Sequence, residues 1–130
     1  MVRDYDPSAI PAVHNLETVP PVRDEPGFSQ VVYRGLDQMI AFTTIEPDKP
    51  DSEPHSHPWE QTNVVVEGEL DFVVGDETVS LEQYDAVTIP PGIEHTSRAT
   101  ADDTAKMMVI WPLREDRVDA TDYQQEFDLK

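Results

Sequence analysis

The sequence predicts one all-β domain, built from short antiparallel strands that close into a sandwich or barrel. Three observations support this fold class. The chain has 130 residues, which is enough for one hydrophobic core but too few for two domains. Runs rich in Val, Ile, Thr and aromatic residues follow one another through most of the chain, and turn residues separate them. No helical pattern lies between these runs, so we expect the strands to pair with one another.

The segment 1–29 is expected to form an extended arm in front of the barrel. It contains five prolines, and each one removes a backbone N–H donor and favours an extended conformation in the residue before it. These prolines argue against a helix. The barrel itself is expected over residues 30–113, and residues 114–130 are expected to form a C-terminal tail.

Six runs in the barrel region are expected to supply its strands. Gly68 interrupts the longest run, Gly75-Asp76 follows it, and Pro90-Pro91-Gly92 ends the fifth run, so hairpins should connect them. In the tail, Tyr123 and Phe127 are four positions apart, which fits either one short amphipathic helix or a loose end. In chain order the runs are "QVVYRG", "DQMIAFTTIE", "QTNVVVEGELDFVVG", "ETVSLE", "DAVTIPPG" and "AKMMVIWPL".

The charge composition excludes two classes of partner. The chain has 9 basic and 27 acidic residues, which gives a net charge of −18. This excess argues against binding to nucleic acids or to anionic membrane surfaces. The acidic residues are spread over every segment, and their mutual repulsion destabilises a compact state unless cations screen it. We therefore expect the protein to come from the salt-rich cytoplasm of a halophile.

The sequence carries no signals for export, membrane insertion or thiol chemistry. It has no cysteine, so neither disulfides nor thiolate catalysis are available. The N-terminal stretch "MVRDYDPSAIPAVHN" lacks an apolar signal core, and no run of about 18 apolar residues occurs. These features predict a soluble, cytoplasmic protein.

The stretch "HSHPWEQ" concentrates candidate metal ligands. Side chains alternate along a strand, so His55 and His57 should point the same way, Gln61 should be in phase with them, and Glu60 should not. A bulge would reverse the choice between Gln61 and Glu60. His95 follows the turn in "TIPPGIEH". Taken alone, an H-x-H pair is more often a solvated surface pair, but three imidazoles and one oxygen suit a divalent transition metal.

The order and spacing of these residues resemble the two motifs of the cupin family. The stretch "HSHPWEQTNVVVEG" is similar to the first motif, and "YDAVTIPPGIEH" is similar to the second. The resemblance covers residues from roughly 30 to 114 and implies a cupin double-stranded β-helix, which is a jelly-roll barrel with the metal inside its mouth. It also implies one divalent transition metal per chain (Ni, Fe, Zn, Mn or Co), held by His55, His57, Gln61 and His95.

Three positions depart from the cupin pattern. Gln61 stands where most cupins have Glu, so the ligands stay neutral and the ion keeps its full charge, which favours anionic substrates. Tyr84 stands where the second motif usually opens with Gly, and no glycine precedes the histidines in "IEPDKPDSEPH". These last two departures concern only the shape of the loops.

A narrower resemblance points to a substrate class. The forms "HSHPWEQ", "GDETVSLE", "IPPGIEH" and "PLRED" are similar to KdgF-type cupins, which open unsaturated uronic acid monomers into linear keto acids. This resemblance implies a small anionic substrate. Arg114 in "PLRED" would clamp its carboxylate, with pairing to neighbouring acids as the alternative. Where the KdgF type has an acidic residue on the last strand this chain has Met108, which cannot transfer a proton.

A replacement for that acid is sought among the other carboxylates. Glu60 is the preferred catalytic acid, because Asp85 fits the turn before "AVTIP" and Glu94 fits the solvated surface. Several aromatic or thioether side chains could also form the pocket wall, with core packing as the alternative. Of these, Trp59 has the best position, because it lies between two ligands. The candidates are Trp59, Met39, Phe42, Phe72, Met108 and Trp111.

Three functions remain open at this stage. The first is a metal-dependent enzyme that opens or isomerises a small carboxylate or uronic-acid-type sugar. The second is a metal-dependent dioxygenase acting on an enol, and the third is a non-catalytic cupin that binds a metabolite. We also expect a homodimer, because the sheet edges of a small barrel need cover and the arm can add a strand to a partner.

Overall fold

The computed structural model describes residues 15–34, 38–100 and 102–112, and all the regular structure in these ranges is β-strand. The all-β prediction is confirmed. Within the described ranges there is no helix long and apolar enough to cross a membrane. The strands are β1 (Arg23–Glu25), β2 (Phe28–Arg34), β3 (Gln38–Ile45), β4 (Gln61–Glu67), β5 (Leu70–Val74), β6 (Glu77–Leu81), β7 (Ala86–Ile89), β8 (His95–Ala99) and β9 (Ala105–Pro112).

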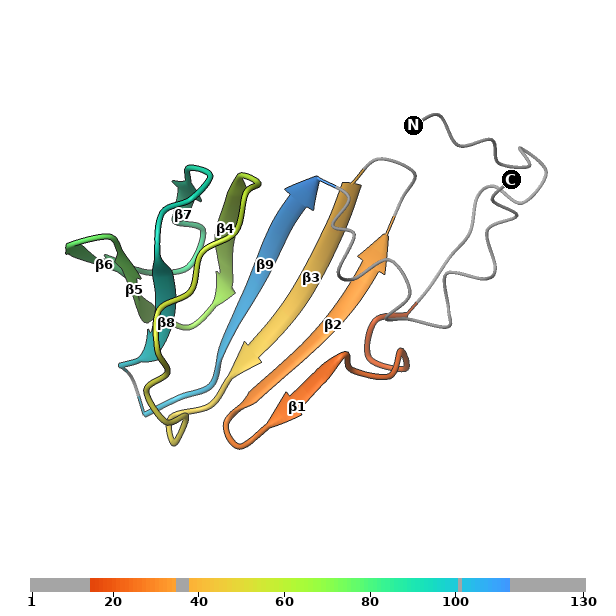
Figure 1. Ribbon diagram of the computed structural model, residues 1–130. Helices are drawn as coiled ribbons and strands as arrows, with labels where there is room; N and C mark the ends of the chain where they lie inside the picture. The colour runs from red at the N-terminus through yellow and green to blue at the C-terminus, as the bar shows by residue number, and fades with distance from the viewer. Residues whose placement is uncertain (1–14, 35–37, 101, 113–130) are drawn as a thin grey trace, which may run out of the picture.

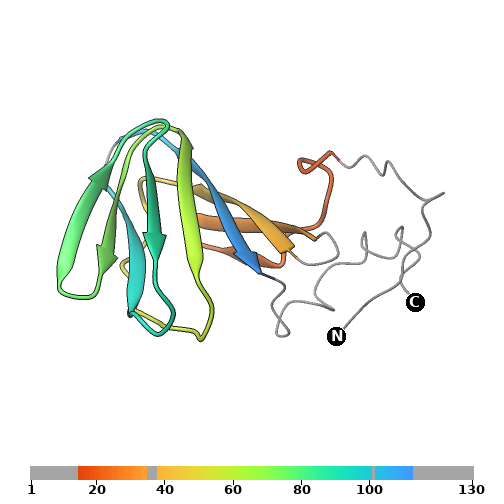
Figure 2. The ribbon, with the colours of Figure 1, turned by 90° about the horizontal axis from the view of Figure 1, so that it is seen from above.

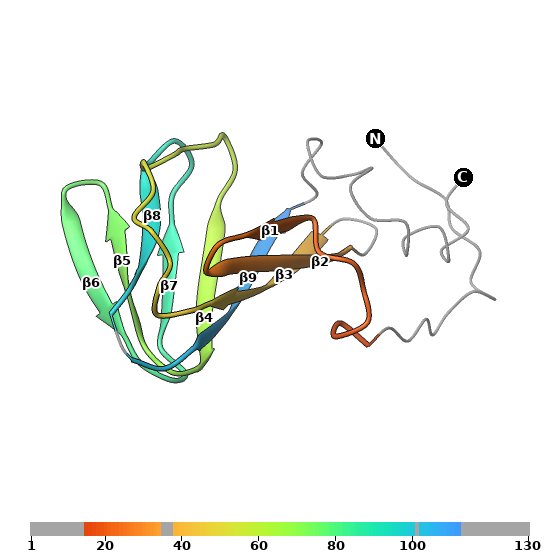
Figure 3. The ribbon, with the colours of Figure 1, turned by 90° about the horizontal axis from the view of Figure 1, so that it is seen from below.

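The strands form two antiparallel sheets. The larger sheet has the order β1-β2-β3-β9-β4-β7, and the smaller sheet has the order β6-β5-β8. The smaller sheet lies beside the β4–β7 end of the larger one, away from β1 (Figures 1 and 3). Seen from above, β2 and β3 extend to one side of the molecule and the β5–β6 hairpin lies at the other (Figure 2). Because β4 pairs with β7 and β5 pairs with β8, the chain winds between the sheets as in a jelly roll.

Strands β3 and β9 supply the centre of the core. The two strands pair in register from Gln38↔Pro112 to Ile45↔Ala105, so residues opposite each other share a face. Burial alternates along both strands, which gives one inward and one outward row on each. Burying a side chain of Leu or Met size stabilises the fold by roughly 1.5–3 kcal/mol. The inward row consists of Met39, Ala41, Thr43 and Ile45 of β3 and Ala105, Met107, Val109 and Trp111 of β9.

Gly68 carries the chain from the larger sheet to the smaller one. It lies between β4 and β5 with φ +78°, and a Cβ on it would lie 2.8 Å from the carbonyl oxygen of Thr104. The register of β4 against β9 shifts between Val65 and Glu67, just before this turn. Such a bulge increases the local bend of a strand. The single run expected over residues 61–75 is therefore two strands that belong to different sheets.

The observed strands differ from the predicted ones at both ends of the barrel. β1 and the first residues of β2 lie within the segment predicted as an arm, so the sheet begins at Arg23 rather than after residue 29. β8 was not predicted, because its sequence "HTSRA" lacks an apolar run. The segment 114–130, with Tyr123 and Phe127, and residues 1–14 of the predicted arm lie outside the described residues.

Candidate metal centre and substrate cavity

A cavity of about 310 Å³ opens between the inward faces of the two sheets. Its walls come from strands of both sheets and from the loop that joins β3 to β4. The volume lies at the lower end of the range for small-molecule sites, which begins at about 300 Å³. Several inward positions that a purely structural barrel would fill with apolar residues are polar here. These buried polar wall residues are Gln30, Thr43, Gln61, Asn63, His95, Thr96 and Ser97.

Backbone hydrogen bonds fix the loop that carries two of the histidines. The N–H of His55 donates to the carbonyl of His95 at 3.0 Å, and the N–H of His95 donates back to the carbonyl of His55 at 2.9 Å. The N–H of Gly92 donates to the carbonyl of His57 at 2.8 Å. The loop after β3 therefore runs along the start of β8, as Figure 1 shows. The main chain alone brings the two predicted motifs together.

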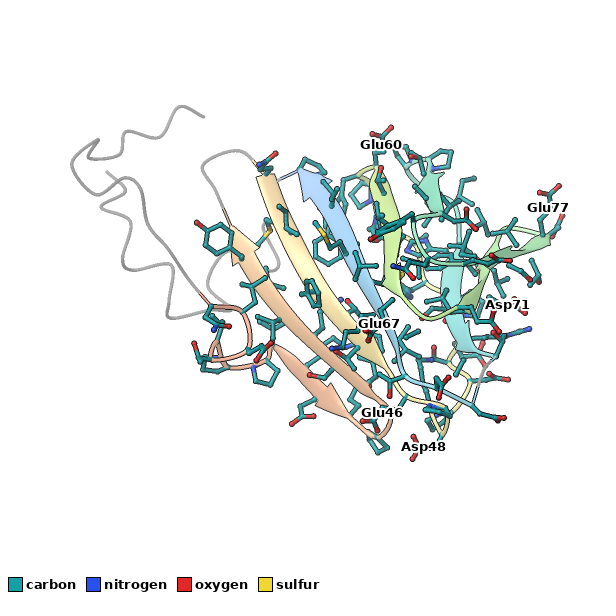
Figure 4. The ribbon with its side chains drawn as sticks, turned by 180° about the vertical axis from the view of Figure 1, so that it is seen from behind. Glu46, Asp48, Glu60, Glu67, Asp71 and Glu77 are labelled. Carbon is teal, nitrogen blue, oxygen red and sulfur yellow. The ribbon has the colours of Figure 1, made fainter. Side chains whose placement is uncertain are left out.

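The four predicted ligands lie close to one another. The imidazole centroids are 4.5 Å apart for His55 and His95, 4.8 Å for His57 and His95, and 6.2 Å for His55 and His57. The side-chain oxygen of Gln61 lies 2.9 Å from Nε2 of His57. Burial differs among them, since His95 is 1% exposed, Gln61 is 5% exposed and His55 lies on the exposed rim. The strand parity separates Gln61, which is buried, from Glu60, which is exposed and points outward (Figure 4).

Backbone carbonyls orient two of the three imidazoles. Nδ1 of His57 lies 2.9 Å from the carbonyl oxygen of Trp59, and Nδ1 of His95 lies 2.9 Å from that of Ile93. A carbonyl can only accept, so Nδ1 carries the proton in each ring, and in the neutral ring Nε2 keeps its lone pair. Hydrogen bonding of the second ring nitrogen is the usual arrangement for a histidine that binds a metal.

The distance between Nε2 of His57 and Oε1 of Gln61 indicates whether these residues fit a metal ion. Oε1 of Gln61 accepts a hydrogen bond from Nε1 of Trp111 at 2.7 Å, and because an indole can only donate, this atom is the oxygen. In the neutral ring, Nε2 of His57 then presents a lone pair to this oxygen at 2.9 Å. Two ligand atoms at about 2.1 Å from one ion, at a right angle, are separated by about 3 Å. The pair therefore fits a shared cation.

The fit depends on the amide oxygen as well as on the histidines. In the part of the chain that the structure describes, no three His, Cys, Asp or Glu side chains form a metal cage by themselves. Gln61 is held for this role by its neighbours, because its Nε2 donates to Oδ1 of Asn63 at 2.8 Å. Asn63 in turn donates to the sulfur of Met107 at 3.1 Å. Sequence reasoning missed Asn63, although its signal was a polar residue in phase with Gln61 on an inward face.

The predicted wall residues divide between the cavity and its surroundings. Trp111 and Phe72 line the cavity, and the ring of Phe72 stacks on His95 with centroids 6.1 Å apart. Trp59 is half-buried and stacks on His57 with centroids 5.0 Å apart and an interplanar angle of 12°. Met39 is fully buried in the core and does not line the cavity.

Phe42 and Met108 lie on the opposite face of the larger sheet, so their prediction as pocket residues was wrong. They pair with each other across β3 and β9, in the outward row of each strand. Phe42 lines a separate cavity of about 680 Å³ on that outer face. Because side chains alternate, the residues of β9 that face the inner cavity are Met107, Val109 and Trp111, and none of them is a general acid or base.

Of the two predicted catalytic residues, the structure describes only Glu60. Glu60 is exposed and lies outside the lining, and Arg114 lies outside the described residues. Asp85 accepts a hydrogen bond from the N–H of Glu82 at 2.8 Å, which is the turn role expected for it. Among the described residues, Glu53 is the carboxylate that lines the cavity, and it comes from the loop between β3 and β4.

Two cationic side chains that were not predicted also line the cavity. Arg23 lies in the β1–β2 hairpin, and Lys49 lies in the loop after β3. The guanidinium of Arg23 covers the ring of Phe28 at 4.4 Å and donates to the carboxylate of Glu25 at 2.7 Å. This hydrogen bond lowers the pKa of the Glu25 carboxyl. No hydrophobic period marks either segment, so sequence patterns gave no signal for these residues.

Comparison with known proteins agrees with the sequence motifs. A family model described as a cupin domain matches residues 41–111. No match was found among curated proteins. Similar solved structures include KdgF from Halomonas sp., with 24% identity and a TM-score of 0.64, covering 74% of this chain and 89% of that one.

Two further solved structures have the same fold at lower identity. The polyketide cyclase RemF from Streptomyces resistomycificus has 21% identity and a TM-score of 0.67, covering 79% of this chain and 80% of that one. TT1209 from Thermus thermophilus has 18% identity and a TM-score of 0.66, covering 78% of this chain and 97% of that one. These likenesses establish the fold alone.

Proposed function

The chain belongs to the cupin family, and from this premise we propose that it is a metal-binding enzyme acting on a small carboxylate of the uronic-acid type. The observation that carries the proposal is the meeting of His57 and Gln61 at 2.9 Å, next to the rings of His55 and His95. The ion is one divalent transition metal per chain, since Ni, Fe, Zn, Mn and Co all suit imidazole and amide oxygen ligands.

The ligand set determines what a bound ion would contribute. His55, His57, Gln61 and His95 would hold it, and the ion would act as a Lewis acid that polarises a substrate oxygen. All four ligands are neutral when the imidazoles are unprotonated, so they leave the charge of the ion uncompensated. An anionic substrate is therefore favoured at this end of the cavity, although the whole chain carries a net charge of −18.

The reaction that the resemblance to KdgF-type cupins implies is an isomerisation. The anomeric hydroxyl of an unsaturated uronic acid loses a proton as the bond between C1 and the ring oxygen breaks. The enol released at C5 takes up a proton at C4, so no oxidant or reductant is needed. One group that accepts and returns a proton is sufficient. We assign this role to Glu53, the carboxylate that lines the cavity.

The first experiment measures metal content and turnover on tag-free protein in molar salt. Wild type should contain about one transition metal per chain, and His95→Ala should lose it, while the exposed control Glu60→Gln should keep it. Glu53→Gln should keep the metal but lower kcat about a hundredfold on unsaturated galacturonate. Turnover is followed by the loss of ultraviolet absorbance of the conjugated double bond. A metal-free wild type, or full activity in Glu53→Gln, would contradict the respective assignment.

Two outcomes of this experiment would redirect the proposal. Oxygen consumption with an enol substrate under air, and no reaction under nitrogen, would indicate a dioxygenase. A bound metal without turnover, combined with a large drop in melting temperature for His57→Ala, would indicate a non-catalytic cupin. The second outcome has some support in the structure, because the inward residues of β9 cannot transfer a proton.

We also propose that the chain forms a homodimer in a salt-rich cytoplasm. The outward face of the larger sheet supports the dimer, because half-buried apolar side chains lie along it. A partner would cover this face or the short edge strand β1. Light scattering at high salt should give twice the chain mass, and a monomer would refute the dimer. The half-buried side chains are Val31, Phe42, Met108 and Ile110.

A further inference from the structure

Lys49 brings a positive charge to the cavity, and its nearest polar partners are neutral. Its Nζ donates to the carbonyl of Pro50 at 3.1 Å, to Oγ of Ser52 at 3.5 Å and to the carbonyl of Ser97 at 3.2 Å. None of these three acceptors carries a charge. Within the described residues, the ion pairs closer than 4 Å are Arg23–Glu25 and Lys106–Glu67, and Lys49 takes part in neither.

The environment of Lys49 disfavours its charge. Partial burial lowers the pKa of the ammonium, and the nearby charge of Arg23 acts in the same direction, while Asp51 and Glu25 oppose the shift. A lowered pKa for a lysine means that the folded chain holds this charge less easily than the unfolded chain. An anion placed in the cavity would compensate for the water that Lys49 has lost.

The β1–β2 turn fixes the position of Lys49. Gly27 in this turn has φ +73°, and a Cβ on it would lie 2.5 Å from Cα of Lys49. The N–H of Glu46 donates to the carbonyl of Gly27 at 2.9 Å, which ties the start of the loop to the same turn. Because Arg23 belongs to this hairpin and lines the same cavity, the close packing at Gly27 brings two cations to one wall.

The distance between Lys49 and the proposed metal ligands can be estimated from the positions of Ser97 and His95 on β8. Lys49 contacts the backbone of Ser97, and His95 lies two residues earlier on the same strand. Two residues of a strand span about 7 Å. The wall of the same cavity carries Gln30 and Thr43, whose buried side chains are hydrogen-bonded at 3.1 Å. A compact hydroxylated acid would match this cavity if one of its oxygens bound the metal and its carboxylate lay about 7 Å away, next to Lys49.

We propose that Lys49, supported by Arg23, binds the carboxylate of the substrate and selects a sugar acid over the neutral sugar. This inference rests on the proposed function, because it takes the metal end of the cavity at His55, His57, Gln61 and His95 as given. It makes Lys49 a specificity-determining residue for the same site. Lys49 touches the substrate but transfers no proton.

The test measures the binding of two probes that differ in one carboxylate. D-Galacturonate and D-galactose are titrated calorimetrically into metal-loaded wild type, Lys49→Gln and Lys49→Arg at constant chloride. Wild type should bind galacturonate at least about tenfold more tightly than galactose, and Lys49→Gln should remove most of this preference. Lys49→Arg should retain it, because the charge is kept. The affinity for galactose should be the same in all three proteins.

Matched variants separate this role from general effects of charge and folding. Lys106→Gln removes an equal charge from the outer face, next to Glu67, and should leave the preference unchanged. Gly27→Ala keeps the charge of Lys49 but displaces its backbone, so it should weaken galacturonate binding as Lys49→Gln does. Melting temperature and metal content are recorded for every variant. Gly27→Ala provides a second test if Lys49→Gln folds poorly.

The outcomes for this inference and for the proposed function are distinct. If wild type holds no metal, the proposed function fails, and the same probes on metal-free protein still decide the role of Lys49. If Lys49→Gln keeps its metal and its full preference for galacturonate, the inference is overturned. It is also overturned if wild type does not bind galacturonate measurably. Loss of the preference in Lys49→Gln alone, with Lys106→Gln unchanged, supports it.

Discussion

At the scale of single residues, Tyr84 has the most unusual backbone. It is the only non-glycine residue with positive φ in the described part of the chain, at φ 71°, and its side chain is 77% exposed. Its N–H donates to the carbonyl of Val65 at 2.7 Å, so the turn between β6 and β7 requires this conformation. The cupin pattern usually has glycine here. The geometry of the turn, rather than the tyrosine side chain, therefore determines the left-handed conformation at this position.

Replacing Tyr84 by glycine should stabilise the protein. The left-handed conformation costs a non-glycine residue about 1–2 kcal/mol, and the entropy of glycine in the unfolded chain offsets about 0.5–1 kcal/mol of the gain. We expect Tyr84→Gly to raise the free energy of unfolding by about 0.5–1 kcal/mol, measured by urea denaturation at fixed salt. Tyr84→Ala retains the unfavourable φ and should show no gain. A lower stability of Tyr84→Gly would mean that the ring makes a stabilising contact.

A second prediction at this scale concerns Asn63, which holds the amide of Gln61 and is not one of the four proposed ligands. Asn63→Leu removes the acceptor for Nε2 of Gln61, so the indole of Trp111 alone is left to orient the amide next to His57. Loss of such a supporting contact typically lowers metal affinity by about 10–100-fold. Asn63→Asp keeps the acceptor oxygen and should stay close to wild type. Competition with a chelator measures the affinity, and equal metal retention in Asn63→Leu would contradict the role.

At the scale of elements, the strands that face the cavity were the hardest to predict. β8 was missed because two of its inward positions are His95 and Ser97, which the cavity requires and which break the hydrophobic alternation. β1 has three residues and contributes pairing but no core side chain. The ligand motifs could be recognised because they depend on short spacings along the sequence, such as the one from His55 to Gln61. The face of the sheet on which Met108 lies could not be predicted, because a shift of one residue along a strand moves every side chain to the opposite face.

The close packing at Gly68, where the chain passes from β4 to β5, predicts how much stability a substitution there would cost. Gly68→Ala would place Cβ 2.8 Å from the carbonyl of Thr104 in addition to imposing a left-handed φ, and we expect a loss of about 3 kcal/mol. Gly75 in the β5–β6 hairpin also has positive φ, but its nearest neighbour would be Ile93 at 3.8 Å. Gly75→Ala should therefore lose only about 1 kcal/mol. Equal losses in chemical denaturation would show that the close approach at Gly68 relaxes.

At the scale of the whole molecule, several acidic side chains lie away from the cavity while two basic side chains line it. Glu46, Asp48, Glu60 and Glu77 project outward from different parts of the described chain (Figure 4). The cavity lining instead holds Arg23, Lys49, His55 and His95, with Glu53 as the carboxylate among its described residues. This distribution was only partly predictable, because composition gives the net charge but not the fold-dependent position of two cations in segments without periodicity.

The peripheral charge predicts a strong dependence of stability on salt. With a net charge of −18, repulsion between the acidic residues opposes folding, and at molar salt the screening length falls to about 3 Å. The melting temperature should rise steadily from about 0.1 M to about 2 M KCl. Lys106→Glu makes the net charge more negative by two and should steepen this rise. A melting temperature that is flat or falls with KCl would exclude a salt requirement.

The paired backbone hydrogen bonds between His55 and His95 have a consequence for how the protein would acquire the proposed ion. Because the main chain already joins the two halves of the ligand set, loading needs no refolding, and the ion should exchange with the surrounding pool. A preformed site with imidazole and amide ligands discriminates weakly among divalent first-row transition metals, because their affinities for such ligands follow one general order. The metals available in the cell, rather than the fold, would then determine which ion is bound. The same protein purified from hosts with different metal pools should carry different ions.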